Sequence, residues 1–122
     1  MAVKVIRKAL VLSGEAGLLA NLTLIQQALV PELVFSTATT LKEALAKQDN
    51  APDDLIIIDA NKDRDEADIQ REFRTLQKRR PDIEVRLVNF GNMVTREDVE
   101  GFFDNLSLSS KIAMHQFRIK CA

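Results

Sequence analysis

The sequence predicts one α/β domain: a three-layer, doubly wound and mostly parallel five-stranded sheet with helices on both faces. Short apolar runs alternate with helical segments of ordinary length, which is the pattern of βαβ units with right-handed connections. The run Leu55–Ile58 is apolar throughout, as in strands buried on both faces. The 122 residues suffice for one core, with no linker between domains. Residues 1–122 therefore read as a single domain, which also fits the regulatory domain of a larger protein.

Five apolar runs are predicted as the strands of this sheet. They are residues 9–12, 33–37, 55–58, 85–88 and 106–108. In the fourth run, Arg86 must reach an edge or meet a carboxylate, because a sheet covered on both faces offers little room for a charge. In the fifth, Ser107 interrupts the apolar pattern.

Helices are predicted between these runs from apolar spacing and from caps. The first carries a stripe on one side and stops before Pro31. The second begins with a capping box at Thr40 and Glu43 and runs to about Gln48, while the third ends at 79–81. The apolar positions of the first and third helices are Leu18, Leu22, Ile25 and Leu29, then Ile69, Phe73 and Leu76.

Two further helices complete the expected order. Thr95 and Asp98 can cap a helix whose apolar side is Val99, Phe102 and Phe103, although Gly101 interrupts it. The last helix should begin near residue 110. Its residues in step are Ile112, His115 or Gln116, and Ile119.

Composition excludes several classes of protein. The formal net charge of -1 gives no global attraction to nucleic acid or to anionic lipid. Cys121 is the only cysteine, so no disulfide forms within the chain and a reducing cytosol is suitable. No apolar stretch approaches the roughly 20 residues of a membrane span. We expect a soluble, cytoplasmic protein.

Charge is nevertheless distributed unevenly along the chain. Residues 49–68 hold eight acidic and two basic side chains, whereas residues 69–80 hold five basic and one acidic. The basic side chains favour a solvated face paired with neighbouring acids over a nucleic-acid surface, since the chain has no Tyr or Trp for stacking. They are Arg71, Arg74, Lys78, Arg79 and Arg80.

Asp59 follows the most apolar run, at the carboxyl edge where open α/β sheets present their chemistry. The stretch 54–59 resembles the third strand of the receiver domain of bacterial response regulators, with its phosphoacceptor aspartate. Residues 80–85 look like the approach to that family's fourth strand, and 101–107 are similar to the turn and fifth strand that follow the fourth helix. The resemblance covers nearly the whole chain.

The chain departs from the receiver pattern around Asp59. The family's pair of acids after the first strand falls on Ser13 and Gly14, with only Glu15 nearby. Its Ser or Thr falls on Asn89, and its Lys on residue 108 or 109. Phosphoryl transfer to a carboxylate needs a cation and a Lys against the developing charge. Asp59 is therefore expected to cap the next turn or to accept hydrogen bonds from loop amides.

The resemblance implies a pseudo-receiver without enzymatic activity or cofactor, which acts in signalling through a protein partner or as a homodimer. The surface of the fourth helix, fifth strand and fifth helix would make the contact. Its candidate residues are Phe102, Phe103, Ile112, Met114, Phe117 and Ile119. Each of them is alternatively a core residue.

Two alternatives remain open. In the first, Asp59 is a phosphoacceptor of a two-component system, and Asp59 and Glu15 hold a water-rich Mg²⁺. In the second, a small flavodoxin-like cofactor binder uses polar side chains at one sheet edge, which lack an evident acid, base or nucleophile. Those side chains belong to Ser13, Gly14, Asn61, Asn89 and Asn92.

Other local patterns are weak. Residues 59–65 resemble the start of a calcium loop, but Arg64 stands where Gly is needed and Gln70 where a bidentate Glu is needed. Residues 14–17 lack a complete phosphate-binding fingerprint. With one His and one Cys, neither a nucleophile triad nor a metal cluster can be built.

Overall fold

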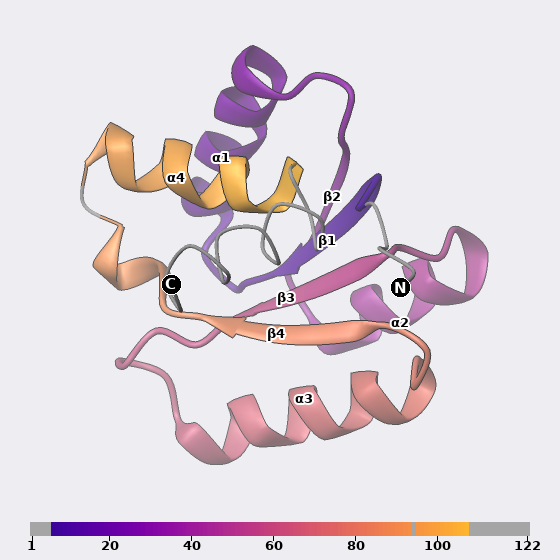
Figure 1. Ribbon diagram of the computed structural model, residues 1–122. Coiled ribbons are helices and arrows are strands. Elements are labelled where there is room, and N and C mark those ends of the chain that lie inside the picture. The colour runs from indigo at the N-terminus through magenta and orange to yellow at the C-terminus, as the bar shows by residue number, and fades with distance from the viewer. Residues whose placement is uncertain (1–5, 94, 108–122) are drawn as a thin grey trace, which may run out of the picture.

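The computed structural model describes residues 6–93 and 95–107, which form an α/β domain around a four-stranded parallel sheet (Figure 1). The strands are β1 (Lys8–Leu12), β2 (Val34–Ala38), β3 (Leu55–Asp59) and β4 (Glu84–Val88). Their order across the sheet is β2-β1-β3-β4, and every pair is parallel. The first four predicted strands are therefore confirmed.

Helices cover both faces of the sheet, as the sequence predicts. The helix α1 (Ala16–Leu29) packs on one face together with α4 (Arg96–Ser107). The helices α2 (Leu41–Asn50) and α3 (Glu66–Arg79) pack on the other (Figure 1). A 3₁₀ turn, η1 (Phe90–Asn92), joins β4 to α4.

Local hydrogen bonds fix where the helices begin. The Thr40 hydroxyl accepts from the Glu43 amide at 3.1 Å, while the Glu43 carboxylate accepts from the amide of Thr39 at 2.7 Å. In α4, the Thr95 hydroxyl accepts from the Asp98 amide, and the Asp98 carboxylate accepts from the Thr95 amide. These bonds satisfy amides that have no partner in the first helical turn, so both predicted caps are confirmed.

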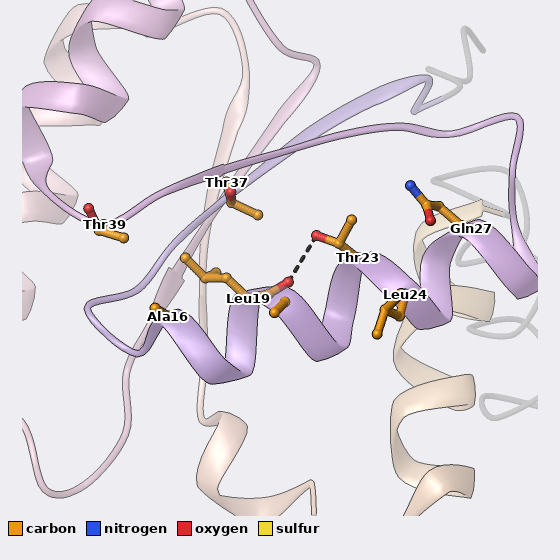
Figure 2. A pocket seen from close by; sticks show the side chains of 8 residues that line it. Ala16, Leu19, Thr23, Leu24, Gln27, Thr37 and Thr39 are labelled. Atoms are coloured by element: carbon orange, nitrogen blue, oxygen red, sulfur yellow. Dashed lines mark hydrogen bonds between the residues drawn. The ribbon is translucent and has the colours of Figure 1, made fainter.

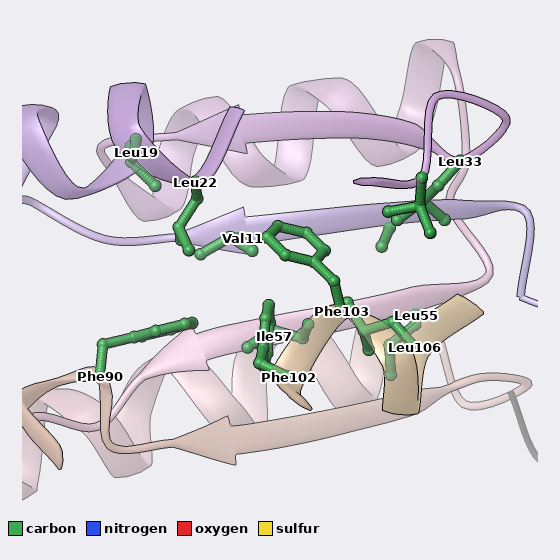
Figure 3. Packing of buried hydrophobic residues seen from close by; sticks show 12 residues of the cluster. Val11, Leu19, Leu22, Leu33, Leu55, Ile57, Phe90, Phe102, Phe103 and Leu106 are labelled. Carbon is green, nitrogen blue, oxygen red and sulfur yellow. The ribbon is translucent and has the colours of Figure 1, made fainter. Parts of the chain in front are cut away.

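The core on the α1 side is built around aromatic rings (Figure 3). Phe102 and Phe103 of α4 are 8% and 0% exposed, and their rings meet edge to face at 5.1 Å. Phe103 also meets Phe35 of β2 at 5.5 Å, and Phe102 meets Phe90 at 5.3 Å. Edge-to-face pairs add to the free energy of burial. These contacts hold α4 across the sheet beside α1.

The core on the other face is aliphatic. Alternate residues of the central strands, such as Leu10, Ile56 and Ile58, point toward α2 and α3. They meet Ala44 of α2 and Leu76 of α3, both fully buried. Both faces of β1 and β3 are thus covered, which explains their continuous apolar sequence.

The predicted fifth strand is corrected by the structure. Leu106 and Ser107 end α4 instead of forming a strand, because Val99, Phe102, Phe103 and Leu106 continue one helical stripe against the sheet. Gly101 does not interrupt this stripe, since it lies on the exposed side of α4. The described residues contain four strands, and the expected last helix lies outside them.

Candidate functional site

Asp59 lies at the carboxyl end of β3, beside the end of β1. From this pair of strands the chain winds in opposite directions, which makes it the topological switch point where open α/β sheets bind ligands. The Asp59 side chain is 1% exposed. The predicted position of this carboxylate is therefore confirmed, and its degree of burial is an additional finding.

Both oxygens of the Asp59 carboxylate accept hydrogen bonds from the protein. The hydroxyl of Ser13 donates to Oδ2 at 2.8 Å, and the amide of Asn61 donates to Oδ1 at 3.1 Å. The bond from Asn61 is the turn-capping contact expected from the sequence. Among the described residues, every buried side-chain oxygen and nitrogen has a hydrogen-bond partner. Asp59 thus connects the loops after β1 and β3.

Ser13 stands where the receiver pattern has an acid, and it has a structural role. Its hydroxyl donates to Asp59 and accepts from the Glu15 amide at 3.1 Å, so it also orders the entry to α1. Ser13 is 1% exposed, whereas Gly14 and Glu15 are exposed. A neutral hydroxyl therefore fills the position next to the buried carboxylate.

Arg64 holds the loop after β3 from the other side. Its guanidinium donates to the backbone carbonyl of Asp59 at 2.7 Å and makes a two-pronged contact with Glu72 of α3, at 3.0 and 2.8 Å. The hydrogen bonds that it donates to the Glu72 carboxylate raise the pKa of Arg64 above its ordinary value. This arginine, which excluded a calcium loop in the sequence, fixes α3 against the end of β3.

Two asparagines converge on Gly91 at the same edge. The Asn89 carboxamide oxygen accepts from the Gly91 amide at 2.9 Å. A Cβ on residue 91 would lie 3.0 Å from that oxygen and 3.3 Å from the carboxamide oxygen of Asn61. Asn61 also accepts from the Asp63 amide at 3.1 Å. The edge is polar, as the sequence predicted, and these carboxamides hold turns in place.

The described residues offer little support for a metal centre. No group of three or more His, Cys, Asp or Glu side chains gathers in residues 6–93 and 95–107 as metal ligands would. In the calcium-like stretch, Asp65 caps α3 by accepting from the Ala67 amide at 2.9 Å. Asp59 and Glu15 would be the ligands of the Mg²⁺ alternative, and one is buried while the other is exposed.

A second buried polar cluster lies near the amino ends of β3 and β4, at the opposite end of the strands from Asp59. Sequence reasoning missed it. Gln48 donates to the Asp53 carboxylate at 2.7 Å and accepts from the Asp53 amide at 3.1 Å. Arg80 donates to the same Gln48 oxygen at 2.7 Å. Burial raises the pKa of Asp53. The polar stretch before β3 had given no sign that one of its acids is buried.

Two of the basic side chains of α3 pair with acidic neighbours, as expected from the charge pattern. Arg71 pairs with Asp68 at 3.2 Å, and Arg79 makes a short contact with Asp49 of α2 at 2.7 Å. Both pairs are largely exposed and contribute little to stability. They reduce the positive potential that a nucleic-acid surface would need.

Two of the six residues of the predicted interaction surface belong to the described part of the chain. Phe102 and Phe103 are core residues and do not form an exposed surface. The other four candidates lie outside the described residues. They are Ile112, Met114, Phe117 and Ile119.

Large apolar side chains are exposed elsewhere. Within the described part of the chain they are Leu24, Leu29, Val34 and Leu87. The first three belong to α1 and β2, and Leu87 belongs to β4 at the far edge of the sheet. No helix in this part of the chain combines the length and apolar character that crossing a bilayer requires.

The structure is a doubly wound α/β domain in which a buried carboxylate at the switch point accepts a hydrogen bond on each of its two oxygens. Comparison of the chain with protein-family models, curated proteins and solved structures gives no match in any of the three. Its function is therefore inferred from the residues themselves.

Proposed function

We propose that the chain is a receiver-like regulatory domain that acts through protein contact, independently of phosphorylation at Asp59. The strand order β2-β1-β3-β4 supports this, because it reproduces the first four strands of the flavodoxin-like order to which receivers belong. The observation that carries the proposal is the state of Asp59: its carboxylate is buried, and both oxygens accept hydrogen bonds from the protein.

The environment of Asp59 opposes phosphoryl transfer. Each carboxylate oxygen already accepts a hydrogen bond, from the Ser13 hydroxyl or the Asn61 amide, and an incoming phosphoryl group would bring further negative charge into this buried site. Such transfer relies on a cation to neutralise that charge. Ser13 supplies no charge, and Arg64 is already engaged by Glu72.

The far edge of the sheet supports contact with a partner. In the described residues no element lies beyond β4, where a fifth strand of the flavodoxin-like order would stand. The Val88 carbonyl accepts from the Ala60 amide, so the peptide groups of alternate residues Val85 and Leu87 face away from β3. The Leu87 side chain is 40% exposed. A partner protein or a second copy of the chain would cover this edge.

The first test is an amide NMR titration with beryllofluoride and Mg²⁺, which mimic the phosphorylated carboxylate. We expect no Mg²⁺-dependent shifts around Asp59 in the wild type, and the same result for Asp59→Asn. Shifts confined to the wild type that spread from Asp59 into α4 would overturn the proposal and support the phosphoacceptor alternative. A copurifying chromophore or an excess native mass would instead support the cofactor alternative.

The second test addresses the partner. Sedimentation and affinity capture should show self-association or a bound protein that Leu87→Asp weakens at least tenfold. Ala46→Asp adds the same charge to an exposed position of α2 and serves as the matched control. Equal association of the two variants and the wild type would show that β4 does not take part in the contact.

A further inference from the structure

The outer edge of β4 is open in the part of the chain that the structure describes (Figure 1). The Val88 carbonyl accepts from the Ala60 amide at 2.8 Å, so alternate peptide groups of β4 turn away from β3. They belong to Val85 and Leu87. Among the described residues, no hydrogen bond from a side chain or from another strand reaches these outward groups.

The opposite edge of the sheet, at β2, is partly occupied. The Lys47 side chain donates to the Thr37 carbonyl. An open groove of about 590 Å³ lies beside this edge, lined by side chains of α1 such as Leu24 and by Thr37 and Thr39 (Figure 2). None of the lining side chains is charged, so charge selects no occupant for the groove. At β4, in contrast, the charges are specific.

Glu84 and Arg86 lie two residues apart and therefore on one face of β4. The Arg86 guanidinium donates to both oxygens of the Glu84 carboxylate, at 2.8 and 3.0 Å. Their side chains are 58% and 38% exposed, so a partner can reach both. An acid followed by a base reads as a base followed by an acid in the reverse direction. A second β4 that runs antiparallel thus meets each charge with its opposite.

We propose that two copies of the chain pair through β4, antiparallel and about a two-fold axis at Val85. The inference deepens the proposed function, on which it rests, by naming the partner as a second copy. Glu84 then lies opposite Arg86 of the second copy at both symmetric contacts. The peptide groups of these residues face β3, so they form the closer type of antiparallel pair, with about 4.5 Å between Cα atoms. An axis at Arg86 would instead place two arginines opposite each other.

The outward peptide groups fit the same register. Val85 lies opposite Val85 of the second copy, and each amide donates to the other carbonyl. The Leu87 amide reaches the Ile83 carbonyl of the second copy. That carbonyl accepts from the Gln77 side chain at 3.0 Å and keeps a second lone pair for the added bond. The Leu87 side chain, 40% exposed in one copy, gains an apolar neighbour in Ile83.

Charge reversal tests the pairing. Glu84→Arg and Arg86→Glu each create two like-charge contacts, so each should raise the dimer dissociation constant at least about tenfold in sedimentation experiments. The double variant Glu84→Arg/Arg86→Glu restores opposite charges and should recover most of the loss. A mixture of the two single variants should associate better than either alone, because acid meets base in the heterodimer.

The matched control reverses a charge elsewhere. Asp49→Arg changes an acid of the exposed pair with Arg79 and should leave association unchanged. Amide spectra verify that each variant is folded. Recovery in the double variant and in the mixture separates an intermolecular charge pair from a general effect of net charge.

Disulfide trapping determines the register. In a Cys121→Ser background, Glu84→Cys mixed with Arg86→Cys should give a disulfide between the two chains, since about 4.5 Å between Cα atoms fits a disulfide. Arg86→Cys alone should cross-link weakly, because the two copies of residue 86 are diagonal neighbours about 7–8 Å apart. Efficient cross-linking of Arg86→Cys alone would place the axis at Arg86 and overturn the proposal.

Failure of this inference differs from failure of the proposed function. A wild type that stays monomeric at NMR concentrations, or a dimer that charge reversal does not weaken, overturns the β4 dimer. A foreign protein that binds the wild type and is lost in Leu87→Asp would then occupy the edge and leave the proposed function intact. A β4 dimer whose Asp59 responds to beryllofluoride and Mg²⁺ would keep this inference and overturn the proposed function.

Discussion

The Ser13 hydroxyl donates a 2.8 Å hydrogen bond to the buried carboxylate of Asp59, a residue 46 positions later in the chain. This bond connects the carboxyl ends of β1 and β3 at the switch point. Ser13→Ala leaves one carboxylate oxygen buried without that donor, which costs about 1–3 kcal/mol of unfolding free energy. Urea denaturation should show this loss. Ser36→Ala, half-buried in β2, is the matched control; an equal loss in both would deny the bond a special role.

The buried Asp53 makes stability depend on pH in an unusual direction. Burial raises the pKa of Asp53 in the folded state above its ordinary value of 3.8. The folded protein therefore binds this proton more tightly than the unfolded chain, and stability from this group is lost as pH rises through the folded pKa. Relative to Asp53→Asn, the wild type should lose unfolding free energy from pH 3.8 upward.

Glu84 provides the control of opposite sign. The hydrogen bond from Arg86 lowers the pKa of Glu84 below its ordinary value of 4.5. Its stabilisation is present above that value and is lost as pH falls through the folded pKa. Relative to Glu84→Gln, the wild type should gain stability as pH rises, by a small amount because the pair is partly exposed. Parallel pH trends for the two variants would contradict these assignments.

Arg64 and Glu72 should be energetically coupled. Glu72 is a buried residue, and its two oxygens both accept from Arg64, so truncating either partner should cost about 1.5–3 kcal/mol. A double-mutant cycle with Arg64→Ala and Glu72→Ala measures the coupling by chemical denaturation. The exposed pair Arg71 and Asp68 should give at most about 0.5 kcal/mol in the same cycle. Similar couplings for both pairs would argue against the rigid role of Arg64.

Alanine substitutions should separate the glycines by their surroundings. A Cβ at Gly91 meets the Asn89 and Asn61 carboxamide oxygens at 3.0 and 3.3 Å, so Gly91→Ala should lower the melting temperature. Gly17 and Gly101 lie in helices with nothing within 4 Å of the added carbon. Gly17→Ala and Gly101→Ala should each stabilise by up to about 1 kcal/mol. Stabilisation by all three would show that the turn at Gly91 relaxes freely.

Local signals in the sequence predicted most of the fold. The capping residues Thr40 and Thr95 and the run Leu55–Ile58 act within a few residues, so their effects are readable without tertiary information. Arg86 likewise met a carboxylate, Glu84, at 2.8 Å. The position of Asp59 could be predicted because it directly follows the apolar run Leu55–Ile58, which ends at the carboxyl edge of the sheet.

What sequence reasoning missed depends on contacts distant in the chain. Leu106 was assigned to a strand, because a short apolar run does not reveal that it continues a helical stripe onto Phe102 and the sheet. The hydrogen bonds that join Gln48 to Asp53 and to Arg80 connect residues up to 32 positions apart. No local sequence pattern marks them. The face that α4 covers is fixed by packing of Phe103 on Phe35, which no periodicity encodes.

The two cores differ in when synthesis can complete them. The aliphatic cluster facing α2 and α3 draws its buried residues from Leu10 to Val85. The aromatic cluster facing α1 includes Leu106 as well as Ala9. A chain emerging from the ribosome can therefore close the first cluster before α4 exists, while α1 keeps an uncovered apolar side. During that interval the apolar side of α1 is exposed, and a chaperone that binds apolar helices can bind there.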